Sequence, residues 1–362
     1  MAGVYISYPF CAQKCTYCNF ASGVFPRELE DRYLDVLLSE LRSTEWPWVP
    51  ETVYLGGGTP SQMAIEALAS ILAAIPGGRS SGATWPEATM EAAPGGLSSE
   101  KSAAWHDAGI NRVSLGVQSF VQKELARTGR RHTAEIVEHE IALLRASGIE
   151  SISVDLIAGL PGQTAASWNH SLDWIERLGV PHVSVYMLEV DEDSRLGREL
   201  LVLGSRYGAG DVPGEDAIAD FYETAVERLA GLGLERYEIS NFARPGFQSR
   251  HNLKYWKREP YLGFGADAHS FDGTLRWQNP EAAADYVASP AALDRVAAEP
   301  LSESFFLGLR LREGVEGNAF PDVIEKFVHD GLLERAGTRV RLTPRGVLLS
   351  NEVFAEFIQP AG

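Results

Sequence analysis

Short apolar strands alternate with amphipathic helices along the first half of the chain. Strands are expected at residues 4–6, 52–55, 88–91, 112–117, 152–157 and 182–188, and helices at 27–44, 65–75, 99–108, 122–127, 134–147 and 165–178. Six strands that alternate with helices predict parallel βα units. Because the strands are apolar and β-branched, we expect a sheet that is covered on both faces. Six units fall short of a closed eightfold barrel, so the predicted fold class is α/β, an open partial barrel.

The second half of the chain has a different pattern. Residues 192–214 resemble a linker-like insertion, 215–229 a helix, and 237–277 a mixed region rich in glycine and aromatic residues. Helices at 302–311 and 322–330, a hairpin at 332–335 and 339–342, and a final helix at 343–357 resemble a winged-helix module. We therefore expect a barrel domain at 1–200, an α/β extension that completes the core at 201–298, and a winged-helix-like α+β domain at 299–362.

The only three cysteines of the chain, Cys11, Cys15 and Cys18, lie directly after the first expected strand. Three closely spaced thiolates suit a soft metal ion or an iron–sulfur cluster. A zinc site needs a fourth ligand, and the nearest histidine is the distant His106. Three buried apolar cysteines are a further alternative, although the residues between them are polar. Three protein ligands for a four-iron cube would leave one iron open to another ligand.

Composition narrows the class of protein. The net charge of −17 argues against a general nucleic-acid binder, so no nucleic-acid partner is expected and the C-terminal module is predicted to be a structural cap. Apolar residues make up 45% of the chain, as in ordinary globular proteins. A cytoplasmic protein is expected, because the cysteines have no disulfide role, the N-terminus does not resemble a signal peptide, and the chain has no long apolar run.

Unusual residues recur where the expected strands end. In βα barrels the active site forms at the carboxyl ends of the strands. The cysteines, the run Gly56-Gly57-Gly58, Glu91 and Gln118 occupy such places, and Asp155 lies within the fifth strand. The glycines would let a ligand approach the backbone, although a simple tight turn would also use them. A buried acid needs a partner, which could be a ligand or an arginine such as Arg112 or Arg130. Gln118 could bind a ligand or cap the next helix.

Several motifs together resemble the radical S-adenosylmethionine (SAM) proteins, and more closely the branch that holds oxygen-independent coproporphyrinogen III oxidase and the heme chaperone HemW. The resemblance runs from Tyr5 to about Ser270. It rests on the motifs Tyr5-x₃-Pro9-Phe10-Cys11-x₃-Cys15-x₂-Cys18, Gly56-Gly-Gly-Thr59-Pro60, Met90-Glu91-Ala-Ala-Pro94-Gly95, Asn111-Arg112-x-Ser114-x-Gly116-Val117-Gln118-Ser119-Phe120 and Asp155-Leu-Ile-Ala-Gly159-Leu160-Pro161-Gly162.

The resemblance implies a radical SAM partial barrel of six βα units and two cofactors. Cys11, Cys15 and Cys18 would hold a [4Fe–4S] cluster, and SAM would chelate its open iron. The residues implied around these cofactors are Tyr5, Tyr17, Gly57, Gly58, Thr59, Glu91, Gln118, Arg130 and Asp155. Carboxylates and an amide suit the amino, ribose and adenine groups of SAM, and Arg130 suits a carboxylate. No residue is predicted to be catalytic, since the cofactor would carry the chemistry.

Three departures distinguish the two members of the branch. The oxidase typically has a further cysteine where this chain has Phe20, and it has a long extension where only four residues precede Tyr5. Ser7 stands where the family often has histidine. These features favour a heme chaperone of the HemW type, with the oxidase as the alternative. Whether the chain is an enzyme stays open.

The segment His251-Asn252-Leu-Lys-Tyr255-Trp256 resembles a heme-chaperone hallmark. Histidine is a good axial ligand of heme iron, and aromatic rings can pack on a porphyrin. Histidine beside aromatic residues is also common in protein cores. His269 is a second candidate ligand. The resemblance therefore implies heme as a third cofactor and a heme-accepting protein as partner, and it allows peripheral contact with membrane-bound acceptors.

Overall fold

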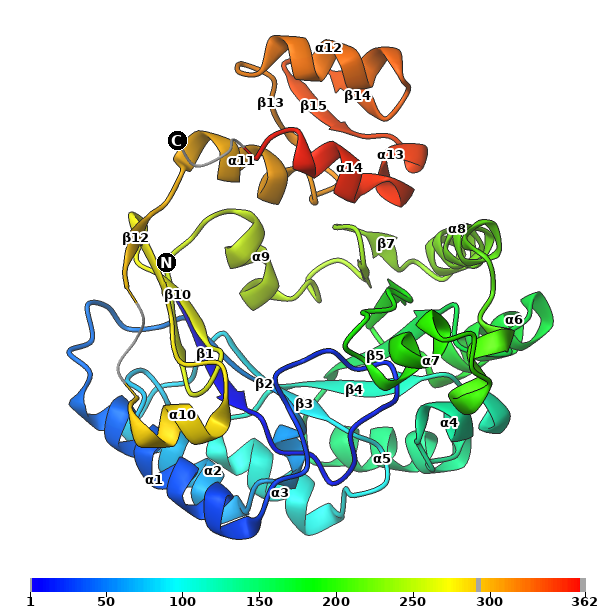
Figure 1. Ribbon diagram of the computed structural model, residues 1–362. Helices are drawn as coiled ribbons and strands as arrows, with labels where there is room; N and C mark the ends of the chain where they lie inside the picture. The colour runs from blue at the N-terminus through cyan, green and yellow to red at the C-terminus, as the bar shows by residue number, and fades with distance from the viewer. Residues whose placement is uncertain (1, 291–293, 359–362) are drawn as a thin grey trace.

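The computed structural model describes residues 2–290 and 294–358, and a curved sheet of 12 strands forms its centre (Figure 1). Six parallel strands are neighbours in chain order: β1 (Gly3–Tyr8), β2 (Thr52–Gly57), β3 (Glu87–Ala92), β4 (Arg112–Gln118), β5 (Ser151–Ala158) and β6 (His182–Met187). This arrangement confirms the predicted partial barrel of βα units.

The two faces of the parallel strands differ in chemistry. Alternate residues such as Val4, Val53 and Val113 are fully buried beneath the helices, whereas the positions between them carry polar side chains on the inner face. The prediction of a sheet covered on both faces did not indicate this difference between them. The inner face is lined by Tyr5, Tyr54, Glu91, Ser114, Ser153 and Asp155, among others, and such a lining suits a polar ligand.

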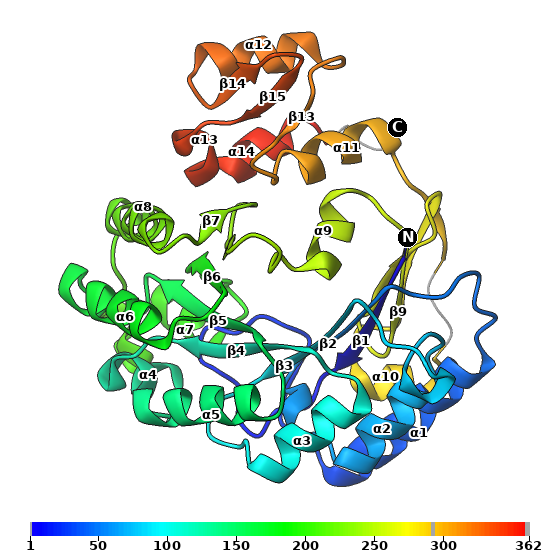
Figure 2. The same cartoon turned by 180° about the vertical axis from the view of Figure 1, so that it is seen from behind.

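Helices cover the outer face in an arc that Figure 2 shows from behind. They are α1 (Arg27–Ser43), α2 (Ile65–Ala73), α3 (Ser99–Ala108), α4 (Gln122–Thr128), α5 (Ala134–Ala146), α6 (Ala165–Leu178) and α8 (Glu215–Gly231), with short 3₁₀ turns η1 (Pro60–Gln62) and η2 (Arg79–Ser81). Leu37 of α1, Leu144 of α5 and Trp168 of α6 bury the faces that their helical spacing predicts.

Strands from the expected extension at 201–298 continue both edges of the sheet. β9 (Tyr261–Phe264) pairs parallel with β1, followed by β10 (His269–Phe271), β11 (Leu275–Gln278) and β12 (Val296–Ala297), while β8 (Asn241–Ala243) and β7 (Glu235–Arg236) extend the β6 edge. The helices α9 (Arg250–Trp256) and α10 (Ala283–Ala288) belong to the same region. The insertion at 192–214, expected to be linker-like, instead contains α7 (Arg195–Leu201) and the 3₁₀ segment η3 (Arg206–Asp211).

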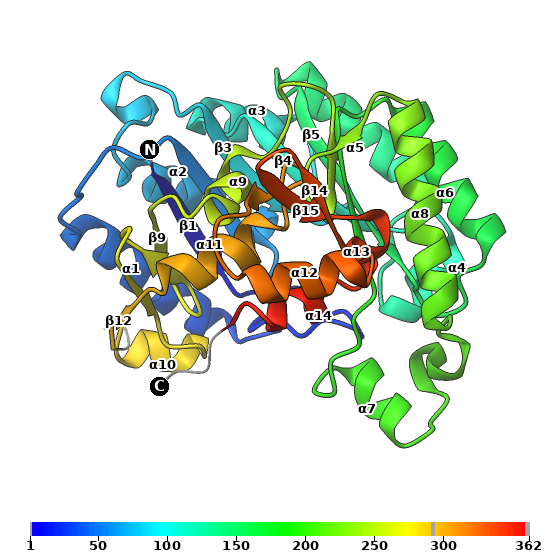
Figure 3. The same ribbon diagram turned by 90° about the horizontal axis from the view of Figure 1, so that it is seen from above.

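The C-terminal module lies over the open side of the barrel, as the view from above shows (Figure 3). It consists of α11 (Pro300–Gly308), β13 (Val315–Glu316), α12 (Pro321–His329), β14 (Leu333–Ala336), β15 (Arg339–Leu342), α13 (Pro344–Leu348) and α14 (Ser350–Ala355). The final helix is therefore two short helices that break at Leu349. Glu303 of α11 joins the module to the barrel, because its carboxylate accepts bonds from Arg258 (2.8 Å) and Arg276 (2.7 Å).

Candidate functional site

The cysteine loop follows β1 and is held in place by backbone hydrogen bonds. Cys11 N donates to Gly23 O (2.8 Å), which closes the loop, and Thr16 N donates to Thr128 O (3.2 Å) at the end of α4. All three thiols are free and half-buried. Burial raises the pKa of the Cys18 thiol. The loop thus presents the three predicted ligands from a braced backbone.

The three thiols do not converge on one point. Within residues 2–290 and 294–358, no group of three or more His, Cys, Asp or Glu side chains is arranged to hold a single metal ion. A mononuclear zinc site requires four ligands around one ion, whereas in a four-iron cluster each thiolate would bind a different iron atom. The donor set of three free thiols on one loop fits such a cluster.

The triple glycine packs directly against the start of the cysteine loop. Gly58 N donates to Tyr8 O (2.8 Å) and Thr59 N donates to Phe10 O (2.9 Å). A Cβ on Gly58 would lie 2.7 Å from Phe10 O, so only glycine fits there. Gly57 has φ +105°, a conformation that favours glycine. The glycine run therefore sets the position of the cysteine loop as well as opening the backbone to a ligand.

Glu91 lies on the inner face beside two tyrosines. Tyr54 donates its hydroxyl proton to Glu91 Oε1 (2.8 Å), and the ring of Tyr5 stacks on Tyr54 with centroids 6.1 Å apart. Burial raises the pKa of Glu91 to about 7, although the Tyr54 hydrogen bond opposes the shift, and nearby Asp155 adds to it. A carboxyl group with this pKa is partly ionised at neutral pH. The sequence motifs do not include Tyr54, but its alternation with Val53 and Leu55 marks it as inward-facing.

Asp155 is held by a group of inward-facing serines. Ser114 Oγ lies 3.0 Å from both carboxylate oxygens, and Ser153 Oγ lies 3.2 Å from Oδ1. Burial raises the pKa of Asp155, and the serine hydroxyls counteract the shift. The two arginines considered as ion-pair partners do not pair with it. Arg112 donates a hydrogen bond to Ser151 Oγ, and Arg130 donates one to the carbonyl of Gly116 (2.6 Å).

Arg130 brings the fourth strand and the cysteine loop together. Its buried guanidinium faces Tyr17 and Cys15; burial opposes the charge, but these two groups raise the pKa of Arg130. Gln118 lies nearby at a β-bulge, with φ +72°, and its amide nitrogen would be 3.0 Å from a Cβ on Gly116. The bulge thus leaves the Gln118 amide beside Gly116.

His251 lies at the other end of the barrel. It is 0% exposed and packs at the first residues of β1 and β2, with Nδ1 2.9 Å from Thr52 Oγ1 and Nε2 2.7 Å from the Tyr255 hydroxyl. Its ring stacks on Tyr54 (5.1 Å). Burial, and then Lys254, lower the pKa of His251 to about 3, so the imidazole is neutral. Both ring nitrogens are engaged, so the predicted heme ligand is not open in this structure. His269, the second candidate ligand, is exposed on β10.

Comparison with known proteins places this geometry in a family. The Radical SAM superfamily model matches residues 5–175, and the HemN C-terminal domain model matches residues 297–349. The heme chaperone HemW of Lactococcus lactis (strain IL1403) is 34% identical, over 98% of this chain and 96% of the relative. The HemW of Bacillus subtilis (strain 168) is 34% identical over 99% of both chains. This chain belongs to the HemW family.

Membership of the HemW family, within the radical SAM superfamily, implies a [4Fe–4S] cluster and SAM, and the three cysteines that such a cluster needs are present. Among solved structures, the coproporphyrinogen III oxidase of Escherichia coli matches with a TM-score of 0.82, at 20% identity, over 98% of this chain and 89% of that one. This likeness confirms the radical SAM fold. None of the helices described in the structure is long and apolar enough to cross a bilayer.

Proposed function

We propose that this protein is a heme chaperone, which binds heme together with a [4Fe–4S] cluster and SAM and passes the heme to an acceptor protein. The observation that carries the proposal is the similarity along nearly the whole chain to relatives named heme chaperones. Phe20, in place of a further cysteine and 66% exposed, is consistent with it. The acceptor is a protein of unknown identity, and we propose a cytoplasmic location.

We propose that Cys11, Cys15 and Cys18 ligate the cluster, which supplies an electron to SAM when both are bound. The SAM contacts that we propose are those on the inner face at the loop end of the barrel. They are Tyr5, Gly57, Gly58, Thr59, Glu91, Gln118 and Asp155, with Tyr17 and Arg130 beside the cysteine loop. Glu91 and Asp155 would accept hydrogen bonds from the amino and ribose groups of SAM, and Arg130 would pair with its carboxylate.

For heme, we propose binding at α9 with His251 as axial ligand. Since Nε2 is hydrogen-bonded to Tyr255, the Tyr255 hydroxyl must move away before His251 can ligate iron. His251 packs at the start of β1, whereas the cysteine loop follows its end, about 16 Å away at roughly 3.3 Å per residue. Heme bound there would be remote from the cluster, which suits storage and transfer better than radical chemistry on the porphyrin.

A hemin titration with paired variants tests the ligand. His251→Ala should lower hemin occupancy at least tenfold, and Tyr255→Phe should keep or raise it, because it removes the hydrogen bond that competes with iron. Thr52→Val, which alters only the Nδ1 bond, is the matched control. The Soret spectrum reports ligation. Hemin binding that is unchanged in His251→Ala would refute the ligand assignment.

The second function to separate is oxidative decarboxylation of coproporphyrinogen III, which the fold match to the oxidase favours. Protein reconstituted with iron and sulfide under anaerobic conditions should form no protoporphyrinogen from coproporphyrinogen III in the presence of SAM and a reductant. Clear turnover would replace the chaperone proposal with the enzyme.

A further inference from the structure

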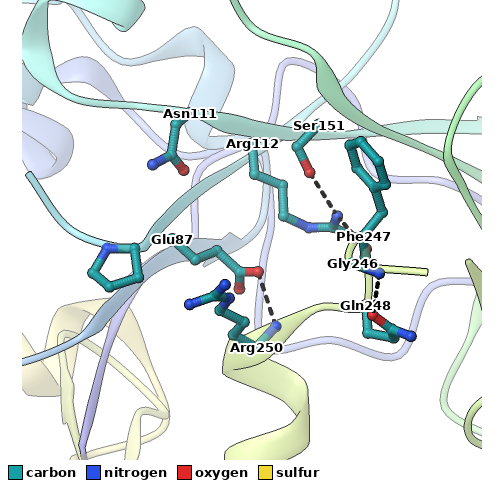
Figure 4. A pocket seen from close by; sticks show the side chains of 9 residues that line it. Glu87, Asn111, Arg112, Ser151, Gly246, Phe247, Gln248 and Arg250 are labelled. Carbon is teal, nitrogen blue, oxygen red and sulfur yellow. Dashed lines mark hydrogen bonds between the residues drawn. The ribbon is translucent and has the colours of Figure 1, made fainter. Parts of the chain in front are cut away.

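A cavity of about 150 Å³ lies at the amino ends of β3, β4 and β5, at the opposite end of the strands from the cysteine loop. Its walls come from the first residue of each strand, Glu87, Arg112 and Ser151, and from the segment 246–250 that leads into α9 (Figure 4). Pro86 and Phe247 add apolar surface.

Arg112 places a buried charge in the wall of this cavity. The residue is 3% exposed, and it forms no ion pair within the described part of the chain. A buried charge without a partner is costly, because its hydration is lost and nothing replaces it. The arginine is therefore the feature of the cavity that most needs a ligand.

The hydrogen bonds of Arg112 leave one edge of its guanidinium without a partner. Nη1 donates to Ser151 Oγ (3.2 Å) and to the carbonyl of Phe247 (3.3 Å). Nε is buried without an acceptor, and Nη2 donates to no acceptor among residues 2–290 and 294–358. Nε and Nη2 together form the edge that binds a carboxylate through two parallel hydrogen bonds.

Glu87 does not neutralise the cavity. Its carboxylate accepts hydrogen bonds from Arg250 N (2.8 Å), His251 N (2.9 Å) and Ser249 Oγ (3.4 Å), which fix it to the start of α9. The exposed side chain of Arg250 lines the same cavity and also lacks an ion pair in the described structure. Two guanidinium groups against one carboxylate leave one excess positive charge, which matches a single monoanion.

We propose that this cavity is a binding site for a small carboxylate, gripped by the Nε and Nη2 edge of Arg112. The apolar walls from Pro86 and Phe247 suit a short alkyl chain next to the carboxylate, as in propionate. The same chemistry is offered by a free small acid and by the carboxylate arm of a larger ligand such as heme. The site does not depend on the chaperone proposal, since the cavity and its charge exist without heme.

Calorimetric titration of propionate into the full-length protein, at constant ionic strength set with chloride, tests the site. Arg112→Gln should weaken propionate binding at least tenfold. Arg250→Glu, at an exposed position that tolerates substitution, should weaken it at least threefold. Arg42→Gln removes an exposed cation on α1 and is the matched control, with affinity unchanged. Circular dichroism verifies that each variant is folded.

Two further arms identify the source of the carboxylate. If hemin displaces propionate and hemin dimethyl ester does not, the cavity takes a heme propionate; if neither displaces it, the cavity takes a free acid. Either result supports the proposal. Three results would overturn it. They are no propionate binding to the wild type, wild-type affinity in both Arg112→Gln and Arg250→Glu, and tighter binding of inorganic phosphate than of propionate.

Discussion

The two ends of the barrel are built in different ways. At the loop end, the cysteine loop and the triple glycine are held by backbone hydrogen bonds between segments close to strand termini, such as Gly58 N to Tyr8 O (2.8 Å). At the amino end, side chains distant in sequence meet: Thr52 and His251 are 199 residues apart, and Glu87 and His251 are 164 apart. The loop end leaves its thiols half-buried, whereas the amino end buries its polar groups almost completely.

This difference teaches that the two ends meet different demands. The proposed metal cluster needs thiols that are accessible to it, and the glycine-rich backbone beside the cysteine loop allows close approach. The amino end uses Glu87 and Thr52 to fix α9 against the strands. Changes at the loop end should therefore affect cofactor content, and changes at the amino end should affect stability and the α9 segment.

The largest expected effect is the loss of iron. Replacing any one of Cys11, Cys15 and Cys18 with alanine should abolish the absorbance of the reconstituted cluster, because three protein ligands are the minimum for holding it. Iron and sulfide per protein are measured after anaerobic reconstitution. Asn19→Ala, an exposed change on the same loop, should keep full iron content. A cluster retained in all three cysteine variants would contradict the site.

Next comes Glu87→Ala at the amino end. It leaves the amides of Arg250 and His251 without their acceptor, so the free energy of unfolding should fall by about 3 kcal/mol, at roughly 1–3 kcal/mol per buried donor. Iron content should not change. Urea denaturation measures the loss, and Glu223→Ala on the exposed side of α8 should have almost no effect. Loss of iron in Glu87→Ala would show that the two ends of the barrel are not independent.

Gly58→Ala should have a smaller effect on stability and a clear effect on the cluster. Its Cβ would lie 2.7 to 2.9 Å from backbone atoms of Pro9 and Phe10, which must shift, at a cost of about 2 kcal/mol. The same shift moves the start of the cysteine loop, so iron content should fall. Gly96→Ala, where a Cβ meets nothing within 4 Å, is the control. Equal iron content in the two variants would show that the glycine run does not position the loop.

The smallest effect concerns pH. Burial raises the pKa of Glu91 from 4.5 to about 7, so between these values the native state binds more protons than the unfolded state and stability falls as pH rises. Stability contributed by the protonated form is complete below pH 4.5 and lost above pH 7. Between pH 5 and 8, the free energy of unfolding of Glu91→Gln should therefore fall by about 1–2 kcal/mol less than that of the wild type. Urea titrations at both pH values measure it, and parallel curves for the two proteins would contradict the shift.

The sequence predicted the loop end far better than the amino end. Cys11, Gly57 and Glu91 lie in short motifs, so their proximity follows from where parallel strands end. The contacts of Arg112 with Phe247 and of Glu87 with His251 join residues more than 130 positions apart, and no local pattern indicates them. The polar lining was visible as a period of two in each strand, yet the apolar half of that pattern suggested two covered faces. The helix α7 and the two helices on either side of Leu349 are too short for periodicity to reveal them.

The separation of cluster and heme is the central claim, and hemin stoichiometry in two variants tests it most directly. One variant carries alanine in place of Cys11, Cys15 and Cys18 together, and the other carries His251→Ala. The account predicts that the triple cysteine variant, although free of iron–sulfur cluster, still binds one hemin per chain, and that His251→Ala keeps its cluster and loses hemin. Hemin lost with the cysteines and retained without His251 would contradict it.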